Sequence, residues 1–120
     1  MILIVGAAAS GKKTFAQTLG YAQADIADAV LDSRPVLDNL QELLDHTSLD
    51  DEELLSKLLA HDVVICTEIG SGLVPVCAKD RAWRDRVGHM CMRLSAEADT
   101  VIRMVCGIPT VVKGELPCNL

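Results

Sequence analysis

Two glycines and two lysines near the amino end of the chain have a spacing that suits phosphate binding. Gly6 and Gly11 bracket four residues, and Lys12 follows directly, which matches G-x-x-x-x-G-K-[ST] at every fixed position except the last. In that pattern successive backbone N–H groups cup phosphate oxygens, and the lysine reaches the β- and γ-phosphates as a point charge. A turn of small residues can also be purely structural. The residues expected to hold a nucleoside triphosphate are Gly6, Ala7, Ala8, Ala9, Ser10, Gly11, Lys12, Lys13 and Thr14.

Lys13 departs from the pattern. Its position normally holds a serine or threonine whose hydroxyl coordinates Mg²⁺, which a charged lysine cannot do. Thr14 comes one residue later, about 100° further round a helix. Either the metal is held without this hydroxyl, or the Lys13 ammonium replaces part of the charge of the ion. We therefore expect Mg²⁺-dependent turnover to be weakened more than nucleotide binding.

Two acidic residues follow apolar segments and are candidates for chemistry. Asp32 comes after Ala29-Val30-Leu31 and either orients Mg²⁺ and the nucleotide at a strand end or caps the next helix. Glu68 follows the apolar run Val63–Cys66 and precedes a glycine-containing loop. It is either a general base toward a substrate hydroxyl or an ordinary turn acid. Lys12 and Glu68 are the predicted catalytic residues, and Asp32 is the predicted metal ligand.

Strands and helices are expected to alternate around these residues. The stretch Ala24–Asp32 fits either a helix or a short strand, and the pattern alone leaves both open. The expected strands are Met1–Val5, Val63–Cys66, Thr100–Cys106 and Thr110–Lys113, with a loop over Ile69–Val76 and a turn at Gly107-Ile108-Pro109. The expected helices begin at Lys12, run through Val36, Leu37, Leu40, Leu43 and Leu44, run through Leu54 to Leu59, and cover Lys79–Asp99.

This order predicts a single α/β domain over residues 1–120, with three layers and a small, mostly parallel sheet. Ligands collect at the carboxyl ends of the strands in such sheets. The loops after Val5, Leu31 and Cys66 are therefore expected to lie near one another.

Composition excludes several classes of function. The chain has 17 acidic and 11 basic residues, a net charge of −6, which argues against nucleic-acid and anionic-membrane binding. The first apolar run ends at Gly6, too short for a signal peptide or a membrane span. Five cysteines without C-x-x-C spacing predict reduced thiols. These features predict a cytoplasmic protein.

Several segments together resemble one family. They are Gly6–Lys12, Thr67–Val76, Arg84–Gly88, Arg93-Leu94, Ala98-Asp99 and Val105–Pro109, with Leu31-Asp32-Ser33 resembling a strand-end acid. The chain resembles the bifunctional adenosylcobinamide kinase / adenosylcobinamide-phosphate guanylyltransferase family of cobalamin biosynthesis. The resemblance implies a RecA-like P-loop fold, ATP or GTP with Mg²⁺, a corrinoid substrate and a homotrimer. It also implies two reactions, phosphorylation of a corrinoid alcohol and GMP transfer through a guanylylated histidine.

The histidine segment of the family is missing from this chain. The stretch between Gly20 and Asp32 is too short to carry it, and His46, His61 and His89 stand in other contexts. Guanylyl transfer is therefore not carried over. Two hypotheses remain: a nucleotide-dependent kinase acting on a cobinamide-like alcohol, or a shortened relative that binds nucleotide as a regulatory or assembly subunit. Lys13 and the missing histidine segment favour the second, and the block around Glu68 favours the first.

Overall fold

The computed structural model describes residues 1–69 and 78–116. The expected loop around Gly70, Gly72 and Pro75 lies outside the described residues, as do Cys77 and Cys118. The elements in chain order are β1 (Ile2–Gly6), α1 (Lys12–Thr18), a 3-10 turn η1 (Gln23–Asp25), β2 (Ile26–Asp28), β3 (Val36–Asp38), α2 (Leu40–His46), α3 (Asp51–Leu59), β4 (Val63–Thr67), α4 (Ala78–Glu97), β5 (Thr100–Val105) and β6 (Ile108–Lys113).

The strands form one six-stranded sheet in the order β2-β3-β4-β1-β5-β6. Pairing is parallel from β2 to β5, and only β6 runs antiparallel, next to β5. The central strand β1 pairs with β4 on one side and β5 on the other, so Gly6 lies beside Thr67 and Met104. The predicted small, mostly parallel sheet is confirmed.

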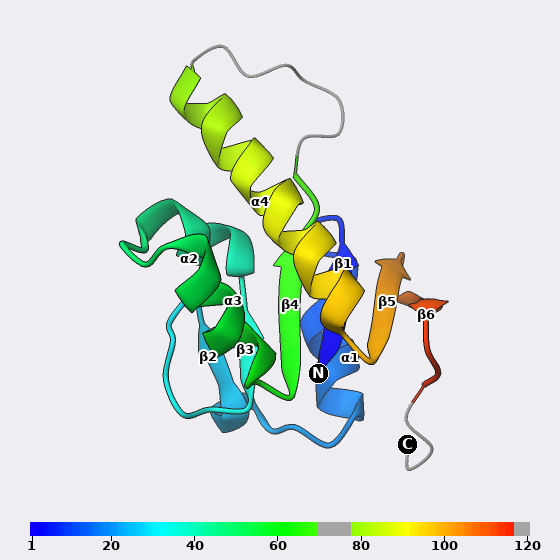
Figure 1. Cartoon of the computed structure of the whole chain (residues 1–120). Helices are drawn as coiled ribbons and strands as arrows, with labels where there is room; N and C mark the ends of the chain where they lie inside the picture. The colour runs from blue at the N-terminus through cyan, green and yellow to red at the C-terminus, as the bar shows by residue number, and fades with distance from the viewer. Residues whose placement is uncertain (70–77, 117–120) are drawn as a thin grey trace.

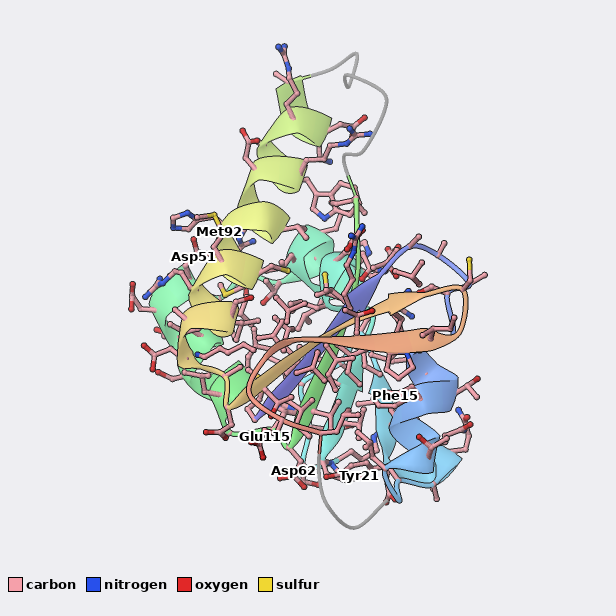
Figure 2. The ribbon with its side chains drawn as sticks, turned by 90° about the vertical axis from the view of Figure 1, so that its right-hand side faces the viewer. Phe15, Tyr21, Asp51, Asp62, Met92 and Glu115 are labelled. Carbon is pink, nitrogen blue, oxygen red and sulfur yellow. The ribbon has the colours of Figure 1, made fainter. Side chains whose placement is uncertain are left out.

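Helices cover both faces of the sheet (Figure 1). Helices α2, α3 and α4 pack on one face, where their leucines meet Leu3, Val64 and Val101. Helix α1 covers the other face, where Ala16 packs with Ile4 and Ile65. Phe15 on α1 and Met92 on α4 accordingly lie on opposite sides of the sheet (Figure 2). Alternate residues of the buried strands thus face alternate layers, as the pleat requires, and the three-layer α/β fold is confirmed.

The structure corrects the prediction of a helix through Val36. Val36 and Leu37 are fully buried in β3, which pairs with β2 on one side and β4 on the other. The helix begins only at Leu40, after Asn39 adopts a left-handed conformation with φ of 57°. The apolar spacing from Val36 to Leu44 satisfies a helix, but pairing to two neighbouring strands decides the structure of its first three residues.

Other boundaries differ by a few residues. Helix α1 ends at Thr18, because Gly20 turns the chain with φ of 106°. The strand that the pattern left open is β2, and it ends at Asp28, before Leu31. Cys106 and Gly107 both have positive φ and form the two-residue turn between β5 and β6, so β6 begins at Ile108.

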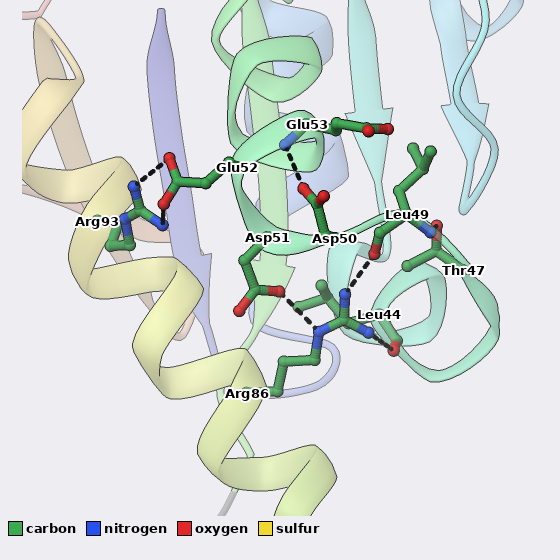
Figure 3. Close-up of polar contacts among 9 residues, drawn as sticks. All are labelled: Leu44, Thr47, Leu49, Asp50, Asp51, Glu52, Glu53, Arg86 and Arg93. Atoms are coloured by element: carbon green, nitrogen blue, oxygen red, sulfur yellow. Dashed lines mark hydrogen bonds and ion pairs between the residues drawn. The ribbon is translucent and has the colours of Figure 1, made fainter.

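Arg86 ties α4 to the α2–α3 connection (Figure 3). Its guanidinium donates to Asp51 Oδ1 at 3.0 Å and to the carbonyl oxygens of Leu44 and Leu49 at 3.1 and 3.0 Å. Asp50 caps α3 by accepting a hydrogen bond from the backbone N–H of Glu53. Arg86 is therefore a structural residue that fixes α4 over the sheet.

Within the described part of the chain, we find no helix that combines the length and the apolar character needed to cross a membrane.

Candidate functional site

The turn after β1 has the backbone shape that its glycines predict. Ala9 and Gly11 have positive φ, 58° and 92°. At Gly6, an added Cβ would lie 2.6 Å from Ser10 Oγ and 2.7 Å from the carbonyl oxygen of Met104, so the turn closes only over a glycine. The backbone N–H of Gly107 donates to the Ser10 carbonyl at 2.9 Å and ties the turn to the β5–β6 hairpin. The expected strand–turn–helix context is present.

Lys12 is held over the turn that precedes it. Its side chain is largely buried, and Nζ donates to the carbonyl oxygen of Ala7 at 2.6 Å. Burial lowers the pKa of Lys12, and the nearby carboxylates of Asp38 and Glu68 partly oppose that shift. An ammonium in this position is poorly hydrated, so an anion beside it would recover electrostatic energy that water does not supply.

A hollow of about 630 Å³ opens along the turn at the carboxyl ends of β3 and β4. We call it the first hollow. Its lining residues are Ala8, Ala9, Ser10, Gly11, Lys12, Lys13, Thr14, Asp38, Asn39, Gln41, Glu42, Thr67, Ile69 and Trp83. Most of the residues predicted to bind nucleotide, from Ala8 to Thr14, thus share one concave surface with an acid at the end of β3.

Asp38 is the acid that faces the phosphate turn. Partial burial raises the pKa of its carboxyl, and the backbone N–H of Asn39 together with the charges of Lys13 and Lys12 partly oppose the shift. Asp38 Oδ1 accepts that N–H at 2.8 Å, which fixes the carboxyl at the strand end. A carboxylate near two ammonium groups and open to a hollow can bind a metal ion or accept a proton from a hydroxyl.

A chain of hydrogen bonds joins the ends of β2, β3 and β4 beside the first hollow. Asn39 Nδ2 donates to Asp28 Oδ1 at 2.6 Å, and Gln41 Nε2 donates to Asn39 Oδ1 at 3.0 Å. Gln41 Oε1 then accepts the backbone N–H of Thr67 at 3.0 Å. Trp83 Nε1 donates to the Gln41 carbonyl at 2.8 Å, which places the indole of α4 on the wall of the hollow.

Glu68 lies on the other side of the turn. Its backbone N–H donates to the Gly6 carbonyl at 2.8 Å. Both carboxylate oxygens are taken by Arg103 of β5, with Nε at 2.8 Å from Oε1 and Nη2 at 3.2 Å from Oε2. Glu68 and Arg103 line a hollow of about 220 Å³ with Ala7–Ser10 and the end of β5, which we call the second hollow.

The structure does not bring Asp32 to this site, which corrects its sequence-based placement at the phosphate turn. Asp32 accepts hydrogen bonds from Arg34 at 2.6 and 2.9 Å, and Arg34 also donates to the carbonyl of Ile26, the first residue of β2. Asp32 therefore lies at the amino ends of the strands, where Tyr21 and Asp62 also meet (Figure 2). The connection from β2 back to the start of β3 has carried it to the edge opposite the turn.

The histidines also lie away from the phosphate turn. His46 is exposed in the last turn of α2, and His89 is exposed on α4. His61 is buried just before β4, at the amino edge of the sheet, with Nδ1 2.9 Å from the carbonyl of Lys57. Each of the three histidines is described, and none of them lines the first or the second hollow.

Comparison with protein families decides where the chain belongs. The family model described as cobinamide kinase / cobinamide phosphate guanyltransferase matches residues 36–112, more than half of the chain. The chain belongs to this family. No curated protein is similar enough to the chain to count as a match. Membership supports a cobinamide kinase/guanyltransferase-like function in cobalamin biosynthesis.

The range matched by the family model contains Asp38, Glu68 and Arg103. The phosphate turn lies before its first residue. Sequence reasoning missed Asp38 and Arg103. Asp38 carries a readable signal, because it follows Pro35-Val36-Leu37 as Glu68 follows an apolar strand. Arg103 carries none, since its partner is 35 residues away.

Proposed function

We propose that this member of the family is a nucleotide-dependent kinase that transfers the γ-phosphoryl group of ATP or GTP to the hydroxyl of a cobinamide-like corrinoid. The observation that carries the proposal is the first hollow, which brings Lys12 and Lys13 together with Asp38 at one edge of the sheet. Phosphoryl transfer needs this combination, because catalysis consists mainly of positioning the phosphates and stabilising their charge.

Lys12 would bind the transferred phosphoryl group and stabilise the charge that develops on its oxygens. The turn residues from Gly6 to Gly11 would hold the phosphates through backbone N–H groups. Asp38 takes the role that the sequence suggested for Asp32. The Asp38 carboxylate faces the first hollow, as Lys12 does, and would orient the substrate hydroxyl or hold a metal ion.

Asp38 suits the role of base better than Glu68. Both oxygens of Glu68 already accept hydrogen bonds from a guanidinium, which makes a carboxylate a weaker base. Burial raises the pKa of Asp38 instead, which makes it a stronger base once ionised.

The residues present fit Mg²⁺ only as an ion brought in with the nucleotide. Asp38 supplies one carboxylate, and Lys13 stands where a metal-binding hydroxyl is expected. Within the described ranges, no three acidic, histidine or cysteine side chains gather as a metal site. Mg²⁺ commonly takes one or two carboxylates and completes its shell with phosphates and water. When bound, the ion would neutralise charge between the phosphates.

A binding-only role is the second candidate, favoured by Lys13 in place of the metal-binding hydroxyl. Incubating the purified protein with ATP or GTP and adenosylcobinamide, and following phosphorylated corrinoid by mass spectrometry, separates the two. The kinase proposal predicts product that is lost in Lys12→Ala and Asp38→Asn and kept in Arg93→Gln, a remote surface variant. Nucleotide binding without product would refute the kinase and support the regulatory subunit.

A further inference from the structure

Arg103 is a cation beside the phosphate turn that the proposed function leaves unused. It lies on β5 directly opposite Val5 of β1, the residue before Gly6. Its side chain is 55% exposed, and its guanidinium forms a two-pronged pair with Glu68. The backbone N–H of Glu68 is itself bonded to Gly6. The pair is thus anchored to the first residue of the turn.

The turn has a cation on each side. Ala8, Ala9 and Ser10 line both hollows, with Lys12 in the first and Arg103 in the second. A polyphosphate held by the backbone N–H groups of Ala8 and Ala9 would therefore have a cationic side chain within the hollow on either side. The backbone N–H of Ser10 already donates to the Ala7 carbonyl at 3.2 Å. The geometry makes Arg103 available to the same ligand as Lys12.

The chemistry of the pair favours exchange of one anion for another. The Arg103 side of the pair is open to solvent, which screens its attraction to Glu68, so a more highly charged anion can compete with the carboxylate for the guanidinium. A phosphate group is tetrahedral, but two of its oxygens can also accept hydrogen bonds from one guanidinium, and it carries more negative charge than a carboxylate. Glu68 holds the guanidinium near the turn through two hydrogen bonds, which limits the side-chain freedom that phosphate binding would otherwise remove.

We propose that Arg103 is a second phosphate-binding cation of the nucleotide site, and that Glu68 is the positioning residue that holds it beside the turn. The inference rests on the proposed function and changes the expected role of Glu68. On this account Glu68 acts through Arg103 and does not abstract a proton from the substrate. A nucleotide would draw Arg103 from the carboxylate toward its phosphates, adding positive charge at a site that lacks the usual metal-binding hydroxyl.

The test compares Arg103→Gln with Arg93→Gln, a matched control whose arginine pairs with exposed Glu52 on the α3–α4 side. Calorimetry of intact protein with ATP, ADP, AMP and inorganic tripolyphosphate, without Mg²⁺, measures the effect of each charge. We expect Arg103→Gln to weaken ATP and tripolyphosphate about tenfold to a hundredfold. The loss of affinity should be smaller for ADP and smallest for AMP. Arg93→Gln should bind all four ligands like the wild type.

Two further variants separate a ligand contact from a structural one. Arg103→Lys keeps one positive charge and should recover part of the lost affinity. It also provides the test if Arg103→Gln does not fold. Glu68→Gln should weaken tripolyphosphate less than Arg103→Gln does, since the guanidinium remains. Equal ATP affinity in Arg103→Gln and Arg93→Gln would overturn the role of Arg103 and leave the kinase proposal standing. A folded wild type that binds none of the four ligands would overturn both.

Discussion

Two residues at this site carry charges that their surroundings oppose. Lys12 and Asp38 lie in one hollow, and burial disfavours the charged form of each. Groups with such shifts cluster at functional sites. The site is therefore expected to cost stability in the nucleotide-free protein and to recover it on binding.

Asp38→Asn tests this at the residue scale through pH. Because the pKa of Asp38 is raised in the fold, wild-type protein gains protons on folding and loses stability as pH rises from the ordinary aspartate pKa through the folded value. The asparagine variant lacks this loss. Urea unfolding should show equal stability below about pH 4 and a more stable variant at neutral pH. Asp45→Asn, on an exposed position of α2, is the control; a pH-independent difference for Asp38→Asn would contradict the account.

Lys13→Thr tests the missing metal ligand. The substitution restores a hydroxyl at the position where P-loop proteins bind Mg²⁺. We expect Mg²⁺ to raise ATP affinity more in the variant than in wild type, by about tenfold or less, since one coordinating oxygen is added to a partly hydrated ion. Calorimetry with and without Mg²⁺ measures the difference. If Mg²⁺ already raises the ATP affinity of the wild type strongly, Lys13 does not impair Mg²⁺ binding.

Whole elements place these residues, and the sequence predicts the elements unevenly. The apolar runs of β1, β4 and β5 and the long stripe of α4 are long enough to identify alone. Strands β2 and β3 have three residues each, and β3 exists because Val36 and Leu37 pair with strands on both sides. That pairing is non-local, so the sequence pattern favours Asp32 as the acid at a strand end, whereas the structure has Asp38 there.

At the element scale, Arg86 is expected to matter for stability and not for nucleotide binding. Arg86→Met leaves the carbonyls of Leu44 and Leu49 without their donors and should destabilise the fold by about 1–3 kcal/mol. Arg93→Met removes an exposed pair on the same helix and should cost much less stability than Arg86→Met (Figure 3). Urea titration of both variants checks this, and equal losses would refute the structural role of Arg86.

The whole molecule is organised around β1, which comes first in sequence and lies between β4 and β5 in the sheet. The amino group of Met1 also pairs with Asp99 at 2.7 Å, joining residues 98 positions apart. A sheet whose central strands come from both halves of the chain favours cooperative unfolding. We expect one cooperative transition in urea, with Trp83 fluorescence and far-ultraviolet circular dichroism coinciding. Two separated transitions would contradict a single domain. The homotrimer that the family resemblance implies stays a prediction, which light scattering can test.

Nucleotide binding tests the central claim most directly. Isothermal calorimetry of the folded protein with ATP and with GTP, with and without Mg²⁺, should show binding of at least one nucleotide. Lys12→Ala should weaken that binding about tenfold to a hundredfold, because it removes a charged hydrogen bond to phosphate. A folded wild type that binds neither nucleotide under either condition, or a Lys12→Ala variant that binds as tightly as wild type, would contradict the account.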